Sequence, residues 1–125
     1  MMFLKNAAAT GKRGEKLAAK HLCGKGYKIL ARNVRSAHGE IDIIAENSEY
    51  LVFAEVKTRA DNPVHFANYG RPAEAVNKQK QRHIIYTAGI FLQNHPTEKA
   101  VRFDVIEVYL GETIQFNHIE DAFRL

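Results

Sequence analysis

Two strand-like runs, residues 39–46 and 50–59, are joined by a connection short enough to make them partners in a β-hairpin. Both runs are rich in β-branched and apolar residues that alternate with polar ones, which is the pattern of a strand. With a two-residue loop at 48–49, paired positions sum to 97, so Asp42 lies opposite Glu55 on one face. A slip of one residue would put the two carboxylates on opposite faces. This register therefore constrains both the fold and the chemistry of the chain.

The hairpin carries ionisable side chains where a buried strand normally carries apolar ones. Alternation puts Glu55 and Lys57 on one face, roughly 7 Å apart, and the Cβ atoms of Asp42 and Glu55 are expected about 4.5 to 5.5 Å apart. Two carboxylates at that separation repel each other unless a cation lies between them. Mg²⁺ or Mn²⁺ suits such a site, because each prefers oxygen ligands and the remaining positions can be taken by waters and phosphate oxygens.

The order D…E-x-K predicts metal-dependent cleavage of a phosphodiester, with Asp42 and Glu55 as the metal ligands. The metal would polarise the scissile phosphate and lower the pKa of a bound water. Lys57 would orient that water, deprotonate it, or hold the phosphate as a point charge, and the sequence leaves these three roles open. The alternative is an ordinary cross-strand ion pair on a solvated face of the hairpin.

Two expected helices each place one charge on an otherwise small or apolar stripe. The first helix, about 11–23, puts Glu15 in line with Ala18, Ala19 and Leu22. The second, about 73–92, puts Lys80 in line with apolar residues at three- and four-residue spacing; these are Val76, Ile84, Ala88 and Phe91. An unpaired charge on a packing face needs a partner. We expect Glu15 and Lys80 to converge on the hairpin site, and a direct Glu15–Lys80 salt bridge is the alternative.

The remaining elements complete an α-β-β-β-α-β-β order. Strands are expected at 27–34, at 101–110 and, in a short form, at 113–119, with Gly24 and Gly26 ending the first helix. Turns or loops are expected at 60–72, at 93–99 and at Gly111-Glu112. Helices that alternate with strands in this way favour an α/β fold with a mixed sheet flanked by helices.

The chain of 125 residues suits one domain over 1–125. It has no apolar run long enough for a membrane span and no secretory signal, so no membrane partner is expected. A single cysteine, Cys23, favours a reducing compartment, and we expect a cytoplasmic protein.

The net charge of +4 is unevenly distributed. Residues 1–35 carry nine Lys or Arg and one acid, while the rest carries nine Lys or Arg and thirteen acids. A concentrated basic segment is typical of proteins that bind a polyanion, because neutralised phosphates release counterions. A well-solvated basic helix is the alternative.

Other candidate residues give weaker signals. The six histidines show no paired helical spacing, so a zinc site is not expected, although His38 precedes the hairpin run and could lie at the mouth of the site. Asp104 is either a further acid near the site or the ion-pair partner of Arg102, and the ion pair is favoured. The 60–72 loop could close over the substrate or stack on an unpaired base. Its rings that could do so are those of His65, Phe66 and Tyr69.

Several short motifs resemble those of the YraN family, small bacterial proteins with a nuclease-like domain. They are Gly14-Glu15, Gly26-Tyr27, Arg32-Asn33, Gly39 to Asp42, Glu55 to Arg59 and Arg102 to Val105. That family is similar in turn to the PD-(D/E)xK superfamily, which includes type II restriction enzymes and archaeal Holliday-junction resolvases. The resemblance implies a restriction-endonuclease-like core of order α-β-β-β-α-β.

The superfamily pattern also implies roles for individual residues. It implies metal ligation by Asp42 and Glu55, a catalytic Lys57, and an accessory acid at Glu15. Ile41 stands where the superfamily has proline before the aspartate. Because that proline is not a ligand, the difference leaves the expected chemistry intact.

We therefore expect an Mg²⁺- or Mn²⁺-dependent endonuclease that binds DNA or another nucleic acid; DNA, including branched or repair intermediates, is the favoured substrate. Its expected phosphate contacts are Lys80, Arg59, Arg32, Lys12, Arg13 and Lys16. Two rivals are a non-catalytic nucleic-acid-binding adaptor that retains the fold, and an interaction protein without a nucleic-acid role. A homodimer is a further expectation, because cutting both strands of a duplex requires two sites, and so is a repair or recombination protein as partner.

Overall fold

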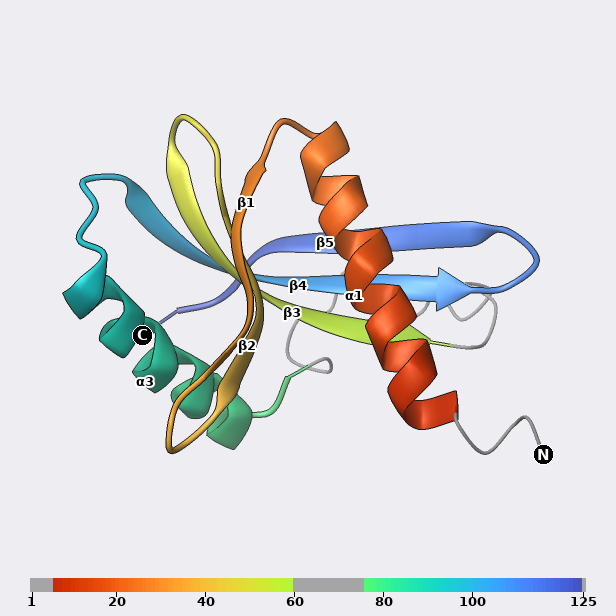
Figure 1. Ribbon diagram of the computed structural model, residues 1–125, viewed down its shortest axis with the longest axis horizontal. Coiled ribbons are helices and arrows are strands. Elements are labelled where there is room, and N and C mark those ends of the chain that lie inside the picture. The colour runs from red at the N-terminus through yellow and green to blue at the C-terminus, as the bar shows by residue number, and fades with distance from the viewer. Residues whose placement is uncertain (1–5, 60–75, 125) are drawn as a thin grey trace.

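The computed structural model describes residues 6–59 and 76–124. It contains two helices and five strands in these residues, in the order α1 (Asn6–Gly24), β1 (Lys28–Arg35), β2 (Glu40–Glu46), β3 (Tyr50–Arg59), α3 (Lys78–Asn94), β4 (Ala100–Leu110) and β5 (Ile114–Phe123). The five strands form one sheet in the order β1-β2-β3-β4-β5 (Figure 1). All neighbours are antiparallel except β3 and β4, which are parallel. This α/β fold with a mixed sheet is consistent with the expected restriction-endonuclease-like core.

Helix α3 connects the parallel pair, because parallel strands need a long crossover connection. Every strand lies next to its neighbour in the sequence. In Figure 1 the twisted sheet narrows to a waist, with α1 crossing its right-hand part and α3 beside its left-hand part.

The two helices pack on opposite faces of the sheet, and the alternation of side chains along the strands divides the core into two layers. The α1 layer joins Ala18 and Leu22 to one set of strand positions; these are Ile43, Ala45, Val52, Ala54, Ile106 and Val108. The α3 layer joins Ile84 and Ala88 to the other set; these are Ile44, Leu51, Phe53, Phe103, Val105 and Ile119. Residues two apart on a strand share a face. A polar residue two positions from an apolar one therefore faces the same helix as that apolar residue.

Helix α1 approaches the sheet most closely where it has no side chain. A Cβ at Gly14 would lie 1.9 Å from the hydroxyl of Thr58 near the end of β3, so a larger residue would push the helix away. Gly14 is next to Glu15, and the close crossing therefore fixes the height at which Glu15 lies over the sheet.

The hairpin register is confirmed. β2 and β3 pair as Ile43 with Ala54 and Ile44 with Phe53, both pairs summing to 97, and Asn47 donates its N–H to the carbonyl of Tyr50 at 3.0 Å across the turn. Asp42 precedes Ile43 and Glu55 follows Ala54, so alternation from this pair puts Asp42 and Glu55 on the same face, and both line one cavity.

Helix boundaries differ from the sequence-based expectation. α1 begins earlier, at Asn6, and ends as expected at Gly24. α3 begins at Lys78 and not near Ala73, because the Asn77 side chain accepts the N–H of Lys80 at 2.8 Å and caps the helix there. Residues 60–75, which include Pro72 and the aromatic groups of the expected loop, lie outside the described residues.

The last strand is longer than expected. β5 continues to Phe123 instead of ending near position 119. A register shift between Phe103 and Val105, together with Asp121 at a φ of 55°, lets the strand pass an irregularity and continue. The last residue of the extended strand, Phe123, stacks on Phe103 with 5.2 Å between the ring centroids.

Candidate metal and phosphodiester site

Asp42 and Glu55 face the same small cavity between the hairpin and the first turns of α3. The cavity has a volume of about 240 Å³ and is lined by Gly39, Glu40, Asp42, Glu55, Lys80, His83 and Ile84. Ile84 belongs to the apolar layer under α3, so the carboxylates begin where that layer ends. The site therefore has an apolar back wall and a charged front.

The turn between β1 and β2 forms one wall of this cavity. A Cβ at Gly39 would meet the His83 Cβ atom at 3.0 Å and its carbonyl oxygen at 3.3 Å, so glycine is what lets α3 approach. The hydroxyls of Ser36 and Thr87 are hydrogen-bonded at 2.8 Å and join the same turn to the same helix. These contacts fix Lys80 above the hairpin.

Glu55 is nearly buried, and two lysines neutralise it. Its side chain is 5% exposed, and its Oε2 atom lies 2.8 Å from the Nζ atom of Lys80 and 3.8 Å from that of Lys57. Partial burial lowers the pKa of Lys80, but the hydrogen bond and charge of Glu55 outweigh it and the pKa is raised. Lys80 is thus firmly cationic, and both lysines are partly exposed, at 46% and 31% of their side chains.

Asp42 is less well compensated than Glu55. Burial and the adjacent charge of Glu55 raise the pKa of Asp42 to about 7, although its Oδ2 atom accepts the N–H of Val56 at 2.8 Å. The charges of Glu15 and Glu40 add to the rise. A carboxyl held half-protonated near neutral pH, beside a second carboxylate, is the arrangement that a divalent cation would relieve.

Glu15 lies close enough for its charge to act on Asp42, but its ion-pair partner is Arg32, at 3.5 Å. The alternative of a direct Glu15–Lys80 salt bridge is wrong, because the two helices cover opposite faces and Lys80 pairs with Glu55. The structure thus brings Asp42, Glu55, Lys57 and Lys80 together and leaves Glu15 at their periphery.

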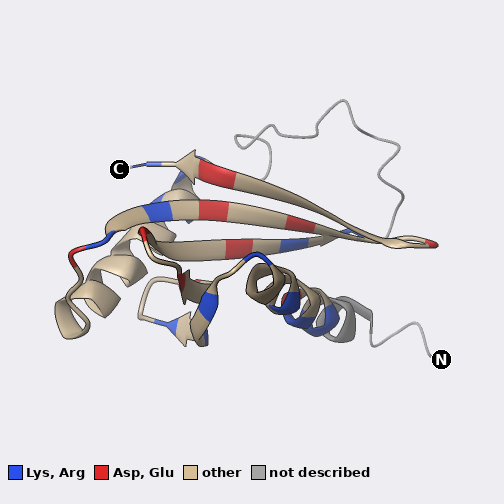
Figure 2. Ribbon diagram, turned by 90° about the horizontal axis from the view of Figure 1, so that it is seen from above, with Lys and Arg blue, Asp and Glu red and all other residues tan. Residues whose placement is uncertain are grey.

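The expected phosphate-binding residues fall into two groups. Lys12, Arg13 and Lys16 are exposed along the outer side of α1, where Figure 2 shows a row of basic residues on the helix face turned away from the strands. Arg59 and Arg32 are tied to acids: Arg59 lies 3.0 Å from Glu107, and Arg32 is paired with Glu15. The α1 row is thus available to a polyanion.

Two weaker candidates lie away from the cavity. The His38 ring packs edge-on against Tyr86, with centroids 4.8 Å apart, and His38 does not line the cavity. Asp104 forms the favoured ion pair with Arg102, through bonds of 2.9 and 2.8 Å. That expectation is confirmed.

The sequence reasoning missed Glu40, His83 and Glu107. Glu40 lies two residues before Asp42 and shares its face, and His83 follows Lys80 by three helical positions, so simple spacing could have found both. Glu107 gives no comparable signal, because its neighbours become visible only when β3, β4 and β5 are placed side by side.

Fold and site together define an α/β protein with a mixed five-stranded sheet and a cluster of two carboxylates and two lysines at the edge of its core. Residues 14–108 match the model of the uncharacterised protein family UPF0102. The chain is 43% identical to a UPF0102 protein of Chloroherpeton thalassium, over 93% of this chain and 94% of the relative. It is 42% identical to one of Caldanaerobacter subterraneus subsp. tengcongensis, over 94% and 97%. The chain belongs to the UPF0102 family, which confirms the resemblance to YraN proteins.

A search of solved structures gives a remote similarity to Pyrococcus furiosus SfsA in complex with Ca²⁺. The identity is 16% and the TM-score 0.36, over 90% of this chain and 63% of that one. This similarity is too distant to indicate a shared activity.

Of the helices that the structure describes, neither has the length and apolar character needed to cross a membrane.

Proposed function

We propose that this protein is a metal-dependent nuclease that hydrolyses phosphodiester bonds in DNA, as the resemblance to the PD-(D/E)xK superfamily implies. The observation that carries the proposal is that Asp42 and Glu55 line the same small cavity, where burial and the charge of Glu55 raise the pKa of Asp42 to about 7. Such a pair destabilises the fold at neutral pH unless a cation joins it. An unfavourable carboxyl that faces a cavity supports a binding role.

The donor set fits a weakly held Mg²⁺ or Mn²⁺. Within the described residues no cluster of three or more His, Cys, Asp or Glu could hold a metal, so the protein would contribute Asp42 and Glu55 alone. Mg²⁺ favours coordination by few protein carboxylates, with waters and substrate phosphate oxygens in the other positions. When bound, the ion would supply Lewis-acid polarisation of the phosphate and a more acidic water.

The chain's own cations would handle the phosphate and the nucleophile. Lys57 is the candidate for the attacking water, because its Nζ atom lies 3.8 Å from Glu55 and is held less tightly than that of Lys80. Lys80, at 2.8 Å from Glu55, is held more tightly and is better placed to bind a phosphate oxygen as a fixed charge. Glu15 would act through water or through Arg32.

The basic face of α1 supports a polyanionic substrate. Lys12, Arg13 and Lys16 are exposed on a helix whose other side packs on the sheet, so they are free of the core and accessible to phosphates. Screening by salt would weaken such contacts strongly.

One observation favours a second function, a nucleic-acid-binding adaptor without cleavage. Lys80 already neutralises Glu55 at 2.8 Å, and a lysine in that position can replace a metal ion as the compensating charge. In this alternative the site would stabilise the fold and α1 would supply all of the binding.

The test incubates purified protein with single-stranded, duplex, flapped and four-way-junction DNA in Mg²⁺, Mn²⁺ or EDTA, beside Glu55→Gln. A matched control is Glu46→Gln, which makes the same change on β2 in a residue paired with Lys99 at the other end of the hairpin. Cleavage that needs a divalent ion, survives in Glu46→Gln and disappears in Glu55→Gln would support the nuclease. Binding of DNA by the wild-type protein without cleavage of any substrate would favour the adaptor.

A further inference from the structure

The sheet face under α3 changes character along its strands. It is apolar at Phe53 and Val105, where α3 packs, and becomes polar one row later. In that row Lys57 of β3 is the register partner of Glu107 on β4, and Glu107 is in turn the register partner of Asn117 on β5. The polar surface that begins at the carboxylate site therefore continues across two further strands.

Glu107 is the buried centre of this row. It is 5% exposed and accepts hydrogen bonds from Asn117 Nδ2 at 3.0 Å, Tyr109 Oη at 3.1 Å and Arg59 Nη2 at 3.0 Å. The first two bonds use one carboxylate oxygen and the Arg59 bond uses the other. The carboxylate is thus fixed by β4 and β5 and presents its second oxygen to β3.

This arrangement restrains the Arg59 side chain, which is 41% exposed. A guanidinium carries five N–H donors, and the bond to Glu107 engages the Nη2 end. A long side chain loses much rotamer freedom when it binds a ligand, and a fixed carboxylate reduces that loss in advance. Arg59 follows Lys57 by two positions on the same strand face, so the two cations point the same way roughly 7 Å apart.

We propose that Glu107 is a positioning residue, and that it holds Arg59 as a binding group for a backbone phosphate of DNA next to the one at the carboxylate site. The DNA strand would then run along β3, past Lys57 and on to Arg59. This inference rests on the proposed function, since it assigns a second phosphate position to the same substrate.

The charge of Glu107 makes the proposal testable by the sign of an effect. If Glu107 acts only as a negative charge near the substrate, Glu107→Gln strengthens DNA binding, because it removes a repulsion. If Glu107 positions Arg59, the same substitution weakens binding, and we expect a loss of about tenfold for one charge-assisted contact.

The experiment measures binding of a short fluorescein-labelled DNA duplex by anisotropy in EDTA, over a range of salt concentrations. Arg59→Ala should weaken binding and reduce the slope of log K against log salt by about 0.9, the value for one neutralised phosphate. Glu107→Gln should add no further loss in the Arg59→Ala background, because both changes remove the same interaction with DNA. Tyr109→Phe removes one support of Glu107 without changing charge, and should weaken binding about twofold.

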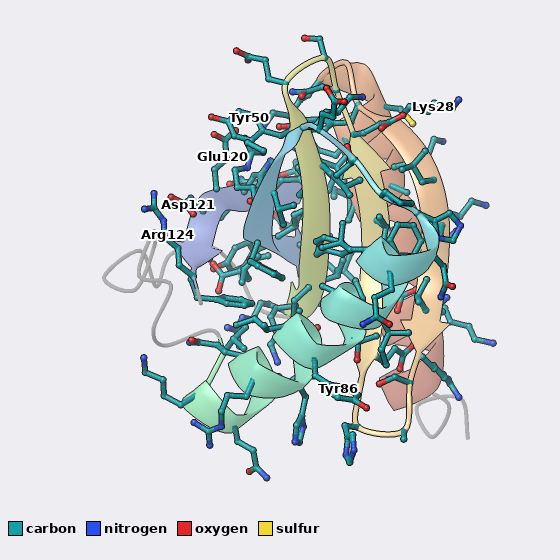
Figure 3. The ribbon with its side chains drawn as sticks, turned by 90° about the vertical axis from the view of Figure 1, so that its left-hand side faces the viewer. Lys28, Tyr50, Tyr86, Glu120, Asp121 and Arg124 are labelled. Carbon is teal, nitrogen blue, oxygen red and sulfur yellow. The ribbon has the colours of Figure 1, made fainter. Side chains whose placement is uncertain are left out.

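The control is Asp121→Asn, the same acid-to-amide change beside Arg124. Figure 3 shows Asp121 and Arg124 together with Glu120 and Tyr50, on a side of the molecule away from Tyr86. Asparagine tolerates the positive φ of this position, and binding should be unchanged. Urea unfolding of each variant confirms that it is folded at the assay temperature.

If the wild-type protein binds the duplex and folded Glu107→Gln and Tyr109→Phe bind it equally well or more tightly, this inference alone is overturned. If Glu107→Gln does not fold, Tyr109→Phe decides, because weaker binding supports the inference and unchanged binding contradicts it. Absence of DNA binding by the wild-type protein would overturn both this inference and the proposed function, whereas binding without cleavage leaves the phosphate position open to the same measurements and affects only the nuclease.

Discussion

Asp104 and Asp42 are both acidic residues within the central sheet, but Asp104 is more deeply buried and its charge has more partners. Asp104 is fully buried and accepts bonds from Arg102, from His118 at 2.7 Å and from the N–H of Asp121 at 3.0 Å. Burial raises the pKa of Asp104, but these bonds outweigh it and lower the pKa below its usual value. Asp42 has one N–H donor and a neighbouring Glu55, and its pKa rises.

The difference separates a structural cluster from a candidate site. In the Asp104 cluster every charge has a partner: Arg102 also bonds to the Tyr27 hydroxyl and lies 4.6 Å from the centre of the Tyr50 ring. The cluster borders a larger cavity of about 680 Å³, yet its buried charges are already satisfied. Removing one partner from a fully paired buried charge is costly, whereas a buried carboxyl without such partners is a candidate for binding a ligand.

The pH dependence of the two carboxyls should have opposite signs. A lowered pKa at Asp104 gives stability that is present above about pH 4 and is lost as the pH falls through the folded-state pKa. A raised pKa at Asp42 has the reverse effect, since the folded state binds a proton that the unfolded state has released. Its unfavourable contribution therefore grows as the pH rises from about 4 to about 7.

The largest expected effect is that of Asp104→Ala. It leaves the Arg102 guanidinium buried without its main partner, so the free energy of unfolding should fall by about 3 to 5 kcal/mol in urea denaturation at neutral pH. Glu120→Ala, which removes the exposed partner of Arg102, should change it by less than about 0.5 kcal/mol. A loss below about 1 kcal/mol for Asp104→Ala would remove the contrast between the two clusters.

Asp42→Asn should act in the opposite direction. It removes a charge that burial and Glu55 disfavour, and the amide oxygen can still accept the Val56 N–H, so unfolding at pH 8 should cost about 2 kcal/mol more than in the wild type. At pH 4 the gain should vanish. A destabilised Asp42→Asn protein at pH 8 would show that the carboxylate is compensated after all.

Replacing Lys80 should reduce the stability more than replacing Lys57, whereas replacing Lys57 should reduce the cleavage rate more. Lys80→Met removes the nearer partner of buried Glu55 and should cost about 1 kcal/mol, while Lys57→Met should cost about half as much because it lies at 3.8 Å. Cleavage should follow the reverse order, with Lys57→Met the more damaging in kcat. Equal effects of both changes on kcat would contradict distinct roles.

The smallest effect on stability is expected on α1. Replacing Lys12, Arg13 and Lys16 with Gln should change the free energy of unfolding by less than about 0.5 kcal/mol, because all three are exposed. DNA affinity should nevertheless fall, and the salt dependence of binding should become shallower by up to about 0.9 for each phosphate that is no longer neutralised. An unchanged salt slope would place the binding surface elsewhere.

The hairpin could be predicted from the sequence because its constraints are local. A two-residue connection and strict alternation fix the pairing of Ile43 with Ala54, and with it the face shared by Asp42 and Glu55. The apolar stripes of the two helices also depend only on local spacing, and this spacing correctly predicted that Ala18, Leu22 and Ile84 are buried.

The remaining contacts depend on pairings between distant parts of the chain. Periodicity placed Glu15 and Lys80 on inward stripes, but not on opposite faces of one sheet, which is what separates them. His118 bonds to Asp104 because β5 pairs with β4, and Arg59 meets Glu107 across parallel strands joined by α3. The start of α3 at Lys78 was missed because the hydrogen bond by which Asn77 caps the helix depends on the geometry of the folded chain.

The most direct test of this contrast is a side-chain carboxyl NMR titration of Asp42 and Asp104 in the same sample, without and with Mg²⁺. We predict that Asp42 titrates near pH 7 in EDTA and that added Mg²⁺ lowers this pKa, while Asp104 stays ionised over the same range. Titration of Asp42 near the ordinary aspartate value, unaffected by Mg²⁺, would contradict the account.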